Sequence, residues 1–174
     1  MWTLVKNGSI VETIEKPKDI RIDGALHSSQ IFTQWSDNER AEVGLIPVAN
    51  DGQEKDEKFY VNTSEVVYSD GNSVRRITNT PKDVDSVKAV LQSEVNQTLR
   101  RFLSQTDWVV VRKTETDEDV PANIAKWRSD LRTKAAALES SINSKSSISD
   151  LEALTVPQSE GATPEFNDWP KLGS

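Results

Sequence analysis

Two segments place apolar residues three or four positions apart over several turns, and this spacing constrains the fold more than any other feature. In the first segment these residues are Val84, Val87, Leu91, Val95, Leu99 and Phe102. In the second they are Ile124, Trp127, Leu131, Ala135, Leu138 and Ile142. Because an α-helix has about 3.6 residues per turn, each set forms one stripe on a helix. The sequence therefore predicts two long amphipathic helices.

The residues near the start of each stripe are typical of helix N-termini. Pro81 should lie in the first turn of the first helix, with Asp83 at its positive end. Pro121 should open the second helix, and the capping-box spacing of Ser149 and Glu152 predicts a last short helix. We expect the two stripes to pack within one chain as a helical hairpin. Association between chains, in a homo-oligomer, is the alternative.

The segment between the two long helices reads Trp-Val-Val-Val at residues 108–111. Aromatic and β-branched residues are enriched in strands, so this run predicts a short intervening strand. An acidic run at residues 115–119 follows it, and the sequence assigns this run to a solvated loop and to the positive end of the second helix.

The N-terminal half predicts short strands separated by turns. Asn7-Gly8 lies between two apolar runs and predicts a β-hairpin, because both central residues of a type I′ turn need positive φ. Ser36 and Glu39 have capping-box spacing and predict a short helix that ends near Gly44. Further strands are expected at residues 20–22, 45–48, 59–61, 66–68 and 74–77, the last three as an antiparallel meander.

Together these patterns predict an α+β fold in three parts. A small antiparallel β-rich domain should occupy residues 1–79, and a helical domain with two long helices and one short one residues 80–156. An extended tail should follow at residues 157–174. The tail is polar and contains two aromatic residues, Phe166 and Trp169, that are suited to anchor a partner protein.

Composition argues against several classes of partner and chemistry. The chain has 21 basic and 28 acidic residues among 174, a net charge of −7, and its basic residues are scattered, which argues against a nucleic-acid surface. It has no cysteine, no apolar run near the ~18 residues of a membrane span and no signal-peptide pattern at its N-terminus. We therefore expect a soluble protein without disulfides or a membrane anchor.

No pattern predicts a catalytic, cofactor-binding or metal-binding residue. The single histidine, His27, has no second histidine or cysteine with which to build a relay or a metal site. The glycines are isolated, so no phosphate-binding loop is expected. Two carboxylates facing each other across a cleft could still hydrolyse a glycan, because such a pair is spatial and is not visible in sequence.

The strongest candidate surface lies on the second helix at Trp127, Arg128 and Arg132. The two arginines are four residues apart and so share one face beside the stripe. One interpretation is that they recognise a partner. The other is structural: Trp127 would pack on Trp108, and the arginines would pair with carboxylates such as Glu115 or Asp130.

A pattern of short motifs surrounds these residues: Thr106-Asp107-Trp108, Val111-Arg112-Lys113, Glu115, Pro121, Trp127-Arg128 and Leu131-Arg132. With this pattern the chain resembles a family of small proteins encoded with the tail-fibre genes of tailed bacteriophages, called tail assembly chaperone-like or tail-fibre assembly-like. The resemblance extends to residues 31–32, 35–37, 44–48, 80–83 and 169–170 and so covers most of the chain.

The resemblance implies a non-enzymatic component of the virion tail that binds tail-fibre or baseplate proteins, without cofactor. One alternative is a transient assembly chaperone that acts in the host cytoplasm and is absent from the particle. A remote alternative is the carboxylate-dependent glycan hydrolase considered above.

Overall fold

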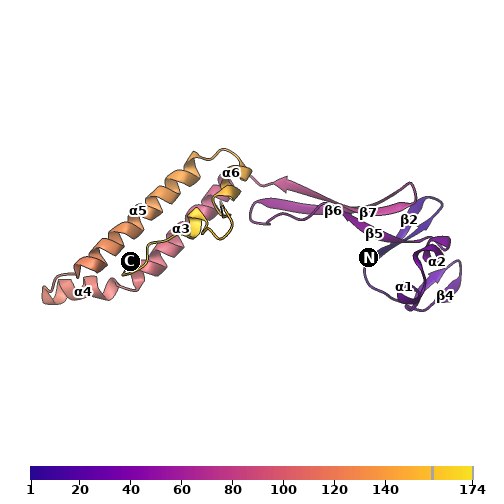
Figure 1. Cartoon of the computed structure of the whole chain (residues 1–174), viewed down its shortest axis with the longest axis horizontal. Coiled ribbons are helices and arrows are strands. Elements are labelled where there is room, and N and C mark those ends of the chain that lie inside the picture. The colour runs from indigo at the N-terminus through magenta and orange to yellow at the C-terminus, as the bar shows by residue number, and fades with distance from the viewer. Residues whose placement is uncertain (158, 174) are drawn as a thin grey trace. The chain divides into compact units, whose positions relative to one another are not determined.

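The structure is a computed structural model that describes residues 1–157 and 159–173. The chain divides into two compact units, Met1–Thr80 and Pro81–Ser174. The first unit contains the strands and two short helices, and the second contains the long helices and the C-terminal segment (Figure 1). This β-rich region followed by helices confirms the predicted α+β fold class.

A five-stranded sheet in the order β2-β1-β5-β7-β6 forms most of the first unit, and a two-stranded sheet of β3 and β4 lies beside its core. The strands are β1 (Trp2–Lys6), β2 (Ser9–Ile14), β3 (Ile20–Ile22), β4 (Ala25–His27), β5 (Leu45–Asp51), β6 (Tyr60–Ser69) and β7 (Asn72–Pro81).

The turn residues determine where these strands reverse. Asn7 and Gly8 have φ values of 53° and 74°, and the antiparallel pairing of β1 with β2 confirms the predicted hairpin. Asp70 and Gly71 have φ values of 51° and 82° and connect β6 to β7 in the same way. Short polar pairs ending in glycine therefore direct the chain back on itself at both places.

The predicted three-stranded antiparallel meander is wrong at its first turn. The strand β6 runs straight through Asn62 and Thr63, which we expected to form a turn. The amide of Asn62 instead donates to the Lys55 carbonyl, 2.7 Å away, so its side chain supports the preceding loop. Outside the meander, β5 and β7 pair in parallel, whereas the domain was predicted to be antiparallel. The strand β6 lies outside β7, and β7 then runs in the same direction as β5.

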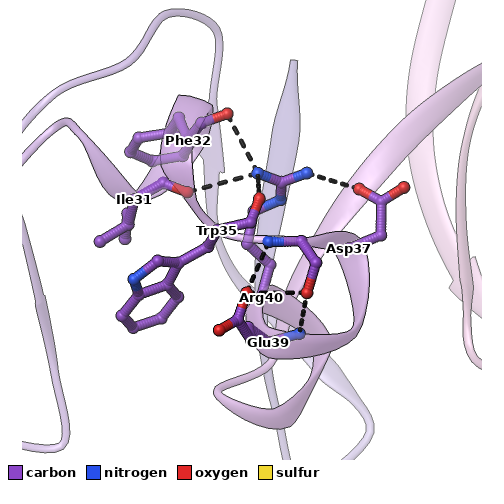
Figure 2. A network of polar contacts seen from close by, with 7 residues as sticks. Ile31, Phe32, Trp35, Asp37, Glu39 and Arg40 are labelled. Carbon is purple, nitrogen blue, oxygen red and sulfur yellow. Dashed lines mark hydrogen bonds and ion pairs between the residues drawn. The ribbon is translucent and has the colours of Figure 1, made fainter.

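The core of the first unit lies between the sheets and two short helices, α1 (Ile31–Gln34) and α2 (Asp37–Glu42). The Ser36–Glu39 capping box begins α2 as predicted. The nearly buried guanidinium of Arg40 contacts the carbonyl oxygens of the α1 segment and the carboxylate of Asp37 (Figure 2). The buried apolar side chains are Leu4, Ile14, Ile20, Ile22, Ile31, Phe32 and Leu45.

Gly44 connects α2 to β5 and has no room for a side chain. Its φ is +78°, and its carbonyl accepts a 2.7 Å hydrogen bond from the amide of Val5 on β1. A Cβ atom at this position would lie 2.2 Å from the Val5 carbonyl oxygen. The residue at 44 must therefore be glycine for the helix to approach the sheet this closely.

The second unit is a helical hairpin in which α3 and α5 pack side by side within the chain (Figure 1). Val87, Leu91 and Val95 of the first stripe are buried, as are all the residues of the second stripe except Ile124, which is partly exposed. The predicted hairpin and both stripes are confirmed. The helices are α3 (Val84–Ser104), α4 (Asp107–Thr116), α5 (Ala122–Ser144), α6 (Ile148–Ala153) and the 3-10 helix η1 (Glu165–Asn167).

Two predicted helix starts are displaced. Pro81 is the last residue of β7 and does not lie in the first turn of α3, which is capped by the Asp83 side chain through a 2.8 Å bond from the Ser86 amide. The last short helix is capped by Ser147 and not by Ser149. Ser147 and Asp150 have the same spacing as Ser149 and Glu152, and the earlier pair lets Ile148 join the core.

The predicted strand at residues 108–111 is wrong, because these residues belong to α4. A single short strand in this unit would have no neighbour with which to share its backbone hydrogen bonds, whereas a helix satisfies them internally. Within the helix, Val109 faces the core and is 2% exposed. Tertiary context thus overrides the strand propensity of the three valines.

Candidate interaction surfaces

Arg128 of α5 connects the end of α3 to the start of α4 in the second unit. From α5, its Nη1 donates to the carbonyl of Leu103 at the end of α3 and to the hydroxyl of Thr106, each at 2.8 Å. Its Nη2 donates to the carboxylate of Asp107, the first residue of α4, at 2.9 Å. Only 10% of the arginine side chain is exposed. Arg128 therefore fixes the turn between α3 and α4 and is not available to a partner.

Several residues that carry the resemblance thus contact one another. Arg128 lies 22 and 21 residues after Thr106 and Asp107 and meets them at this turn, while Trp127 beside it is 5% exposed. Their proximity gives a structural reason for their occurrence together. The structural interpretation of the arginines was right about Arg128 in kind, but its carboxylate is Asp107, and Asp130 pairs with Lys126.

Arg132 lies on the exposed part of α5, and its Nη1 donates to the Arg128 carbonyl one turn earlier at 3.1 Å. That bond is local to the helix. Arg132 is not among the described residues that line the cavity at Phe166 and Trp169.

Trp127, Phe166 and Trp169 come together around one cavity of about 450 Å³. The Nε1 of Trp127 donates to the Pro170 carbonyl at 2.9 Å, and Phe102 packs against the rings of both Trp127 and Trp169. The structural interpretation expected Trp127 to pack on Trp108, but its ring contact is with Phe102. We call this cavity, formed by α3, α5 and residues 166–172, the aromatic hollow.

A second surface, which the sequence did not indicate, is the exposed side of α4. Trp108, Val110 and Val111 are 61%, 41% and 54% exposed. Trp108 and Val111 are three residues apart and so share one side of the helix, whereas Val110 lies on the other side of buried Val109. The Arg112 guanidinium lies 5.4 Å from the centre of the Trp108 ring and also pairs with Glu118. We call Trp108 and Val111 the α4 face. They were missed because a strand prediction places valines in the core.

The resolved pKa shifts of the acidic residues do not resemble those of a catalytic pair. Hydrogen bonds from Ser36 lower the pKa of Glu39, and those from Ser86 lower the pKa of Asp83. A hydrogen bond from Lys113 and its charge lower the pKa of Asp119. All three shifts favour the ionised form and arise at helix caps or in an ion pair. No carboxylate of residues 1–157 or 159–173 lines the aromatic hollow.

Across 1–157 and 159–173, no cluster of three or more His, Asp or Glu side chains is arranged to hold a metal ion. No helix in the same ranges has the length and apolar character to cross a bilayer.

Comparisons with protein-family models, with curated proteins and with solved structures found no match to this chain.

Proposed function

We propose that this protein is a non-enzymatic component of a phage tail that binds tail-fibre or baseplate protein through the α4 face. The observation that carries the proposal is the 61% exposure of Trp108 on α4, a helix whose first residue, Asp107, is bound by the nearly buried Arg128. Tryptophan is strongly enriched among residues that dominate binding energy in protein interfaces. The resemblance to tail-fibre assembly-like proteins supplies the kind of partner.

The surroundings of the α4 face support an interface. Arg112 pairs with Glu118 and Lys113 pairs with Asp119, so charged pairs lie next to the exposed apolar side chains. An apolar centre with a polar rim is the usual arrangement of a protein–protein interface. Exposed apolar side chains gathered on one short helix are otherwise unfavourable in water.

The test is a binding measurement with the tail-fibre protein encoded beside this chain, co-expressed and purified by affinity capture. Trp108→Ala should weaken binding by at least about tenfold, since hot-spot residues contribute about 2 kcal/mol or more. Val90→Ala on α3, where Val90 is 48% exposed, is the matched control and should bind normally. Equal binding by the two variants would show that the α4 face is not the interface.

Mass spectrometry of purified virions separates the two roles that such binding allows. A connector that stays in the tail should be present in fixed proportion to the tail-fibre protein. A transient chaperone in the host cytoplasm should bind the fibre protein during assembly and be absent from the particle.

A further inference from the structure

The aromatic hollow has the size and lining of a ligand site. Its volume of about 450 Å³ lies within the ~300–1,000 Å³ of typical small-ligand sites. Phe102 and Trp127 come from α3 and α5, while Phe166, Trp169 and Leu172 come from the C-terminal segment. Four of the eleven described lining residues are thus aromatic, and one wall is formed by residues 166–172.

The charged side chains that line the hollow are basic. Among residues 1–157 and 159–173, Arg101 and Lys171 line it together with neutral side chains, and no carboxylate does. The Arg101 guanidinium lies 5.4 Å from the centre of the Phe102 ring. Within the same ranges Arg101 forms no ion pair. Glu94, about two turns away along α3, lines an adjoining hollow that Arg101 also lines.

An apolar floor beside a guanidinium without an acidic partner selects a particular ligand chemistry. Large apolar groups gain by leaving water for the aromatic walls, and a carboxylate gains from a charged hydrogen bond to arginine. A ligand that has only one of these groups makes half of the available contacts. The complementary ligand therefore carries a carboxylate next to a large apolar group.

We propose that the aromatic hollow binds a peptide segment of a partner protein in which an acidic residue adjoins an aromatic or large aliphatic residue. The acidic side chain would meet Arg101, and the apolar side chain would pack in the hollow against the rings of Phe102 and Trp169. This site is separate from the α4 face, and the proposal does not depend on what binds there.

The C-terminal segment gives the site a second property. Residues 166–172 are held to the helices by the Trp127–Pro170 hydrogen bond, the Phe102–Trp169 ring contact and a 3.2 Å bond from the Phe166 amide to the Leu154 carbonyl. Because this segment is one wall of the hollow, a bound peptide would add contacts to it. Binding should therefore slow backbone amide exchange in residues 166–172.

The test uses the full chain, labelled with ¹⁵N, and the peptide Gly-Asp-Trp-Leu-Gly, acetylated and amidated so that its only charge is the aspartate. The expected result is a shift of the indole N–H resonances of Trp127 and Trp169 during titration. The same peptide with asparagine in place of aspartate should bind about threefold to fivefold more weakly, as for a partly exposed ion pair.

Two neighbouring arginines provide matched variants. Arg101→Gln should weaken binding of the aspartate peptide by about the same factor and leave binding of the asparagine peptide unchanged. Arg100→Gln removes the same charge from an exposed position that does not line the hollow and should have little effect. No shift at millimolar peptide, equal binding of the two peptides, or equal effects of the two variants would overturn the proposal. Normal fibre binding by Trp108→Ala would overturn the proposed function but would not bear on this peptide site.

Discussion

The two units each contain a nearly buried arginine that ties the end of one helix to the start of the next. In the first unit Arg40 contacts carbonyl oxygens of the α1 segment and Asp37 at the start of α2 (Figure 2). In the second unit Arg128 contacts the last turn of α3 and Asp107 at the start of α4. Both place a positive charge where helix carbonyls lack partners, which is favourable.

The difference lies in where each arginine comes from. Arg40 belongs to α2 and reaches back at most nine residues, whereas Arg128 belongs to α5 and reaches back as far as 25 residues. The α2 start also has its own capping box, but Thr106 does not cap α4, and its hydroxyl donates to the Leu103 carbonyl. The first arrangement is therefore local, and the second makes the position of α4 depend on the whole hairpin.

The largest effect is expected for Arg128→Met. The variant keeps most of the apolar stem, but the buried Thr106 hydroxyl loses the group that donates to it and the Leu103 carbonyl loses one of its donors. We expect a loss of about 2–3 kcal/mol in the free energy of unfolding, the range for hydrogen bonds to charged groups. Urea denaturation followed by circular dichroism measures it, and hydrogen exchange should show that α4 opens first. Unchanged protection of α4 would show that Arg128 does not hold it.

Arg40→Met should cost less, about 1–2 kcal/mol, because the bonds of Arg40 to carbonyl oxygens are part-buried, whereas Arg128 also donates to a fully buried hydroxyl. The loss should appear in the exchange rates of α1 and α2 and leave α3 and α5 unaffected. Arg21→Met is the control, since Arg21 is exposed and donates only to the Gly24 carbonyl. A loss spread equally over both units would contradict the local role of Arg40.

Neutralising the acidic partners should have a smaller effect. The side chains of Asp37 and Asp107 are 75% and 58% exposed, so their ion pairs are screened by water. Asp37→Asn and Asp107→Asn should each cost about 0.5 kcal/mol and should cost similar amounts. Thermal denaturation at low and high salt checks this. If Asp107→Asn cost as much as Arg128→Met, the ion pair would matter more than the bonds to Leu103 and Thr106.

The smallest effect concerns the Ser36–Glu39 capping box at the start of α2, which has no counterpart at the start of α4. Hydrogen bonds from the Ser36 amide and hydroxyl hold the pKa of Glu39 below its ordinary value of 4.5. The ionised side chain therefore stabilises the fold above pH 4.5, and this contribution is lost as the pH falls through the lowered value. Glu39→Gln should destabilise the protein slightly at pH 7 and have no effect near pH 2. Denaturant midpoints at both pH values test this, and an effect that grew at low pH would reverse the sign.

The contrast between the local contacts of Arg40 and the long-range contacts of Arg128 also explains how much of the fold could be predicted from the sequence. Features that depend on a few adjacent residues were predicted correctly: the Asn7-Gly8 hairpin, the Ser36–Glu39 box and the stripes of α3 and α5. Each is fixed by local geometry. The α4 helix was missed, because its local preference is for a strand and the contacts that hold it come from α5.

The site shows the same division. Trp127, Phe166 and Trp169 were singled out as large aromatic residues, and they do meet, but as walls of a cavity that also needs Phe102 of α3. Arg128 was singled out for recognition and proved to be internal. Residue type indicated which side chains matter. Only the folded hairpin shows which of them face inward.

The unequal exposure of the indoles in the helical unit has an optical consequence. Trp127 is shielded from solvent, Trp169 is partly shielded, and Trp108 is open to it. Iodide quenches by collision, so it should remove the long-wavelength emission of Trp108 well before that of Trp127. A macromolecule that covers α4 would protect that emission. The native chain thus carries its own fluorescent reporter of occupancy, with no attached dye.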